Sequence, residues 1–209
     1  MNLRTLSHLM IAAATVLFGF TSPAMAGPPL ICHVIQIGDA KSLPWVDLNY
    51  QKQSGGYDLK NLTPDTLAIL QSDAPVLVRM ETLRRATIYV RQDPQVAKEL
   101  LTRLRARAAD SDLAGRTDPL AWFDVGYLAA AYNEWFETGT KNPANGLDGY
   151  AWVEKALRLR GPDPQMEFAA ALITIMVPKR EHTQYVKKAW AGSKGDALLA
   201  QNMAANFPR

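Results

Sequence analysis

The chain has 209 residues, of which 48% are hydrophobic and 21% are charged, and its formal net charge at pH 7 is +3. These values are ordinary for one globular domain. They lack the large excess of positive charge that marks many nucleic-acid-binding proteins, so no nucleic-acid partner is expected. The single cysteine, Cys32, excludes an intrachain disulfide.

Residues 1–26 are typical of a secretory signal peptide. Arg4 gives the positive start, residues 9–20 form the apolar run, and residues 24–26 read Ala-Met-Ala, a small-residue cleavage pattern. No later apolar run is long enough to span a bilayer. We therefore expect a bacterial protein that is exported to the periplasm or secreted, without stable membrane insertion after the signal is cleaved.

Residues 27–62 predict an extended N-terminal arm. Pro28 and Pro29 disfavour a helix at its start. The isoleucines that follow alternate only weakly with other residues, and turns rich in glycine and proline come after them. We expect this arm to lie on a helical body.

Residues 63–209 predict an all-α domain of about eight helices. Pairs of an N-cap residue and a proline mark helix starts at Thr63-Pro64, Asp93-Pro94, Asp118-Pro119 and Asp163-Pro164. Successive helices with short connections pack antiparallel. The sequence therefore predicts antiparallel helical hairpins, arranged as a bundle or as a short solenoid.

Residues 118–159 predict the central hairpin of this domain. Its first helix, about residues 120–136, is apolar on nearly every face, which indicates that neighbouring helices bury it. Gly126 lets another helix approach closely, and we expect Ala156 to face it. The connection from Gly139 to Gly149 is rich in Gly, Asn and Pro, and a second helix follows it.

This hairpin resembles the tetratricopeptide repeat, whose first helix carries the spacing W-x2-L-G. Those positions are taken here by Trp122, Val125 and Gly126, and the second helix carries Trp152, Val153 and Lys155-Ala156-Leu157. The connection is longer than the tight turn of the family, and Gly149 stands where the family usually has alanine. The resemblance implies a tetratricopeptide-like solenoid, and a generic helical bundle is the alternative.

The first helix of such a repeat also lines the concave face of the solenoid. The resemblance therefore implies peptide-binding residues at Phe123, Tyr127, Ala130 and Asn133. An apolar groove with one amide suits a peptide or a helix. The predicted function is a non-enzymatic exported scaffold that binds a protein or peptide partner and needs no cofactor.

The sequence lacks the motifs of common enzymes. It has no nucleophile elbow, phosphate-binding loop, dinucleotide fingerprint, zinc-protease helix or C-x-x-C pair. Beyond residue 26 the histidines are His33 and His182, which restricts any catalytic triad to these two. Carboxylates alone can hydrolyse glycosides, but no pair of acids stands out. We favour a protein without enzymatic activity.

Cys32 and His33 form the most unusual local pair. Residues 27–33 resemble exported bacterial proteins that carry such a pair just after the cleavage site. A thiolate beside an imidazole suits a soft metal such as Cu(I) or zinc, with further ligands from elsewhere. Pro29 stands where a C-x-x-C-H haem site needs its first cysteine. The alternatives are a small metal- or haem-binding protein or enzyme that uses this pair, a structural cysteine, or a disulfide between chains.

Arginines gather between residues 79 and 116, and Arg103 and Arg107 are spaced to share one helix face. One interpretation is an anion-binding patch for an acidic peptide, an anionic lipid or phosphate. The other is a solvated face whose arginines pair with acids of the same region.

Overall fold

The computed structural model describes residues 27–45, 56–71, 73–137, 139, 141–175 and 181–209. Within these residues the fold is all-α, as predicted, and contains no sheet. The helices are α1 (Pro29–Cys32), α2 (Leu62–Ile69), α3 (Val76–Tyr89), α4 (Pro94–Leu113), α5 (Pro119–Trp135), α6 (Gly149–Arg160), α7 (Pro164–Ile173), α8 (His182–Gly192) and α9 (Ala197–Asn206). The predicted signal peptide lies outside the described residues.

The aspartate–proline pairs start helices where the sequence predicted. Asp93, Asp118 and Asp163 each cap a helix by accepting backbone N–H groups of its first turn, and a proline takes the first helical position. The predicted start at Thr63 is wrong, because α2 already begins at Leu62. A short 3-10 turn capped by Asp58 runs directly into α2 and moves the start upstream.

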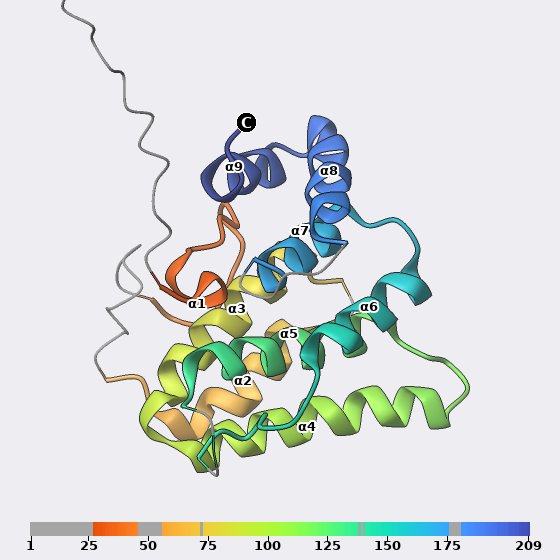
Figure 1. Cartoon of the computed structure of the whole chain (residues 1–209). Coiled ribbons are helices and arrows are strands. Elements are labelled where there is room, and N and C mark those ends of the chain that lie inside the picture. Colours follow the sequence, from red (N-terminus) through yellow and green to blue (C-terminus); the bar gives the residue numbers. More distant parts are fainter. Residues whose placement is uncertain (1–26, 46–55, 72, 138, 140, 176–180) are drawn as a thin grey trace, which may run out of the picture.

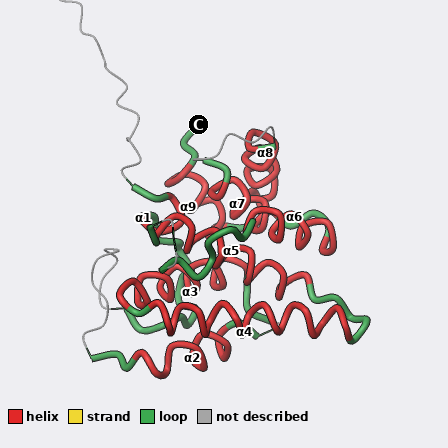
Figure 2. Tube along the Cα trace, turned by 60° about the horizontal axis from the view of Figure 1, so that its bottom comes forward, coloured by secondary structure: helices red, strands yellow, loops and turns green. Residues whose placement is uncertain are grey.

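Helix α5 lies in the middle of the fold (Figure 1). It contacts α3 and α4, and also α6, α1 and α7. Helix α2 packs against α3 and α4, whereas α8 packs against α7 and α9. Both views place α2 and α4 at one end of the molecule and α8 and α9 at the other (Figures 1 and 2). This central position explains why nearly every face of α5 is apolar.

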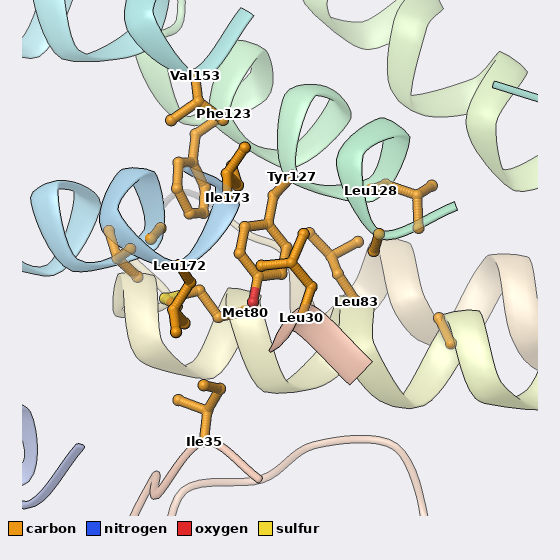
Figure 3. Packing of buried hydrophobic residues seen from close by; sticks show 14 of the residues in the cluster. Leu30, Ile35, Met80, Leu83, Phe123, Tyr127, Leu128, Val153, Leu172 and Ile173 are labelled. Atoms are coloured by element: carbon orange, nitrogen blue, oxygen red, sulfur yellow. The ribbon is translucent and has the colours of Figure 1, made fainter. Parts of the chain in front are cut away.

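The core forms where α5 faces α3, α7 and the N-terminal arm. Phe123 and Tyr127 stack with their ring centroids 5.7 Å apart, and both are fully buried. Figure 3 shows the Tyr127 ring between Leu30 and Met80. Burial of a side chain of this size stabilises a fold by about 1.5–3 kcal/mol. Phe123 and Tyr127, two of the side chains that a repeat would present on an open face, are thus part of the core.

The N-terminal arm contains a short helix that the sequence did not predict. Pro29 takes the first position of α1, where its missing N–H leaves no unpaired donor. Two consecutive prolines therefore start a helix here instead of preventing one. Residues 33–44 form no helix, as expected of an extended arm.

Buried charged groups of α3 attach the arm to the helical body. Glu81 is fully buried, accepts the N–H of Ile35 at 3.0 Å, and pairs with Arg84 at 2.7 Å. Arg84 in turn donates to the carbonyl oxygen of Ile31 at 3.0 Å. The contacts to the arm use backbone atoms, so they hold its path without requiring particular side chains.

Gly126 lies at the contact between α5 and α6, as predicted, but its neighbours differ from the expected ones. A Cβ on Gly126 would lie 2.8 Å from the carbonyl oxygen of Gly149 and 2.8 Å from the nitrogen of Val153. The third-nearest atom is the Cβ of Trp152, at 3.0 Å, so Ala156 is not among the nearest neighbours. The backbones of α5 and α6 therefore meet at the first turn of α6.

Within the described residues no helix is both long and apolar enough to cross a membrane.

Candidate functional site

The connection between α5 and α6 is held in place by Asn133, in the last turn of α5. The Asn133 amide donates to the carbonyl oxygen of Leu147 at 3.0 Å and accepts from the side chain of Asn142 at 3.0 Å. Asp148 then caps α6 by accepting the N–H of Ala151 at 3.0 Å. The end of the connection is therefore fixed beside the end of α5.

A pocket of about 480 Å³ opens where the ends of α5 and α7 meet the start of α6. Its walls are largely apolar and include Ala130, Leu147, Tyr150 and Ile173. Pockets of this size, with apolar walls and a few polar groups, are typical of ligand-binding sites in proteins.

Glu134 is the distinctive polar group of this pocket. Its Oε2 accepts the N–H of Leu30 at 2.8 Å, so the carboxyl also anchors α1. Burial raises the pKa of the Glu134 carboxyl to about 7, against the opposing effect of the Leu30 hydrogen bond. None of the described lysines and arginines forms an ion pair with it. The pocket thus contains a partly buried carboxyl without a described counter-ion.

Two tyrosines divide this pocket from a second one. The hydroxyl groups of Tyr150 and Tyr185 lie 3.0 Å apart, and both donate to Glu154 Oε1, at 3.1 and 3.2 Å. Burial is the main cause that raises the pKa of Tyr185 to about 12. Tyr150 lines the first pocket, while Tyr185 and Glu154 line a second of about 370 Å³. These hydrogen bonds therefore connect a lining residue of the first pocket to two lining residues of the second.

The second pocket is more polar than the first. Its lining includes Glu167, which is 4% exposed and pairs with Lys188 at 3.1 Å. The other oxygen of Glu167, Oε2, is buried without a hydrogen-bond partner in the described structure. The lining of this pocket therefore includes three charged side chains besides Glu167, namely Glu154, Arg158 and Lys188.

The four residues predicted to bind peptide fall into two groups. Phe123 and Tyr127 are fully buried against other helices, so neither lines an accessible groove, which corrects that part of the prediction. The reason is that α1, α3 and α7 cover this face of α5. Ala130 and Asn133 lie one and two turns further along and do line the first pocket.

Cys32 and His33 lie at the end of α1. Cys32 is a free, partly buried thiol, and burial raises its pKa while it lowers the pKa of His33. Among the described residues no group of three or more His, Cys, Asp or Glu side chains is placed to hold a metal ion. The described structure therefore brings no third ligand to this pair.

Arg103 and Arg107 line a shallow pocket of about 550 Å³ with Asp110. Arg103 is exposed, whereas Arg107 donates to the carbonyl oxygen of Leu70 at 2.5 Å and lies 3.7 Å from Asp118. The structure brings the two arginines together, but Arg107 is engaged in joining α2 to α4. Arg103 is the one of the two that is directed to solvent.

Sequence reasoning missed Glu134, the Tyr150–Tyr185 pair and Glu154. Glu134 gave a weak signal as an acid near the end of an otherwise apolar helix. Its burial depends on Leu30, which is 104 residues away in the chain. Comparisons with protein-family models, with curated proteins and with solved structures return no match.

Proposed function

We propose that this chain is an exported, non-enzymatic helical protein that binds an extended segment of a protein or peptide across the two pockets beside Tyr150 and Tyr185. The observation that carries the proposal is a pair of pockets whose linings are joined by the hydrogen bonds of Tyr150 with Tyr185 and Glu154. An extended peptide presents every second side chain to the same side, about 6–7 Å apart. Two pockets whose linings are joined in this way suit two such side chains.

The chemistry of the walls supports a peptide. The first pocket offers apolar surface from Leu147 and Ile173 together with the Glu134 carboxyl. The second offers hydrogen-bonding groups, including Tyr185 and Glu167. Peptide-binding sites combine apolar surface with a few oriented polar groups in this way.

One structural contact and one sequence pattern extend the proposal. The contact of α5 with α6 at Gly126 supports tetratricopeptide-like packing of this hairpin, although its connection is longer than in that family. The signal-peptide pattern of residues 1–26 supports a periplasmic or secreted location.

Affinity capture of binding partners by a protein that consists of residues 27–209 tests the proposal. Ala130→Phe fills the first pocket, and Ala109→Phe makes the same change on the exposed side of α4. We expect the Ala109→Phe protein to retain the partners of the unmodified protein and the Ala130→Phe protein to lose them, with both folded by circular dichroism. Equal capture by the two variants would show that the pocket is not the binding site.

A further inference from the structure

The carboxyl of Glu134 is incompletely paired in the described structure. Its Oε2 accepts the N–H of Leu30, and no described cation forms an ion pair with it. Arg84, which also lies close to the arm, is bound to Glu81 and to the carbonyl oxygen of Ile31.

The charged groups that line the pocket favour a cation. Among its described lining residues these groups are Glu134 and Asp148, both acids. A buried carboxylate without a counter-ion is unfavourable, and a cation that enters the site removes part of that cost. The groups that face Glu134 from neighbouring elements include Cys32 and Tyr127, neither of which supplies a positive charge.

We propose that the first pocket receives a lysine side chain of the bound peptide, with the ammonium group against Glu134 and the methylene groups against Leu147, Ile173 and the ring of Tyr150. This inference rests on the proposed peptide-binding function and names the residue that the pocket selects. Lysine side chains commonly bury their methylene groups along apolar surface while the charged end meets a polar group.

The geometry of Glu134 favours lysine over arginine. A guanidinium group binds a carboxylate best through two parallel hydrogen bonds, which engage both oxygens. One oxygen of Glu134 is already engaged by Leu30. An ammonium group acts as a compact charge and needs only the remaining oxygen.

Nuclear magnetic resonance titration of residues 27–209 tests this inference. The probes are N-acetyl-lysine methylamide and the matched norleucine compound, which has the same carbon stem without the ammonium group. At a pH of about 8, where Glu134 is mostly ionised, the lysine probe should shift the amides of Gly149, Tyr150 and Ile173. We expect its affinity to exceed that of the norleucine probe by about tenfold.

Glu134→Gln separates binding from structure. The glutamine amide oxygen can still accept the Leu30 N–H, but it carries no charge. We expect this variant to bind both probes equally, whereas the exposed change Glu99→Gln on α4 should keep the lysine preference. A lysine preference that survives Glu134→Gln would overturn the inference, as would an arginine probe that binds more tightly than lysine.

The remaining outcomes also decide the question. Tighter binding of butylammonium than of the lysine probe would assign the pocket to a free amine and overturn the peptide side chain as its occupant. Absence of a lysine preference, together with partners lost on Ala130→Phe, would reject this inference alone. A lysine preference with no partner captured through the pocket would reject the peptide function but keep the ammonium site.

Discussion

Gly126 and Gly149 bring the backbones of α5 and α6 into direct contact. A Cβ on Gly149 would lie 2.6 Å from the nitrogen of Ala130, and a Cβ on Gly126 would lie 2.8 Å from the oxygen of Gly149. Contacts this short to backbone atoms are not relieved by a change of side-chain rotamer. The pair therefore fixes the start of α6, and with it one wall of the first pocket.

Gly126→Ala should destabilise the fold, although alanine favours the helix by about 1 kcal/mol. The new methyl group would force α5 and α6 apart, and overpacking costs about 1–3 kcal/mol. Gly126→Leu should cost more than Gly126→Ala. Urea unfolding measures the free energies of unfolding.

The matched control for this prediction is Gly195→Ala. A Cβ on Gly195 would have no neighbour within 4 Å, so this change should leave the free energy of unfolding almost unaltered. Equal stability of the Gly126→Ala and Gly195→Ala proteins would contradict the close contact of the two helices.

Glu81→Ala should strongly destabilise the protein. The change would leave the fully buried guanidinium of Arg84 without its partner and would remove the acceptor of the Ile35 N–H. Loss of one member of a buried pair typically costs about 3–5 kcal/mol. Thermal unfolding measures the loss, and hydrogen exchange at Ile35 should increase. The exposed change Glu99→Ala serves as the control, and equal melting temperatures would refute the role of Glu81.

Arg107→Ala and Arg103→Ala should differ, although the two arginines share one face of α4. Arg107 joins α4 to the carbonyl end of α2 through Leu70, and hydrogen bonds to charged groups contribute about 1.5–3 kcal/mol. Arg103 is exposed, so its removal should change stability by less than about 0.5 kcal/mol. Denaturant unfolding distinguishes the two. A larger loss for Arg103→Ala would mean that the two roles are reversed.

Glu134→Gln should change how stability depends on pH. Burial raises the pKa of this carboxyl from 4.5 to about 7, so the folded state binds the proton more tightly than the unfolded state does. The protonated carboxyl therefore contributes to the free energy of unfolding. This contribution is fully present below pH 4.5 and is lost as the pH rises through about 7. At higher pH the glutamine variant should be more stable than the unmodified protein, by at most on the order of 3 kcal/mol.

Unfolding measured from below pH 4.5 to above pH 7 checks the direction in which the stability difference changes with pH. The difference between the glutamine variant and the unmodified protein should be small in acid and should grow toward neutral pH. Cys32 and Tyr127 face Glu134, but their raised pKa values keep both from titrating in this window. A difference that shrinks as the pH rises would contradict the burial of Glu134.

The helices were largely predictable because their start signals are local. Asp93, Asp118 and Asp163 cap helices through N–H groups two or three residues away, which the sequence displays directly. The predicted helix start at Thr63 was wrong because a preceding 3-10 turn runs into α2, which therefore begins upstream at Leu62. The all-round apolar character of α5 predicted burial, but it did not show which helices cover each face.

The candidate site was harder to predict because it depends on long-range contacts. Ala130 and Asn133 were found through a family resemblance, while Phe123 and Tyr127 were assigned to the same groove and lie in the core. The environment of Glu134 comes from Leu30 in the arm, a contact that no local pattern displays.

The central claim is that the first pocket binds the partner. Photo-crosslinking in cells that produce and export the protein tests this claim most directly. A benzoylphenylalanine residue at Leu147 lies in the wall of the first pocket, and one at Ala109 lies on the exposed face of α4. We predict that peptide adducts form at position 147 and are absent at position 109. The yield of adducts at position 147 should decrease when Glu134→Gln is introduced. Adducts of equal yield at both positions, or none at position 147, would contradict the assignment of this pocket as the partner-binding site.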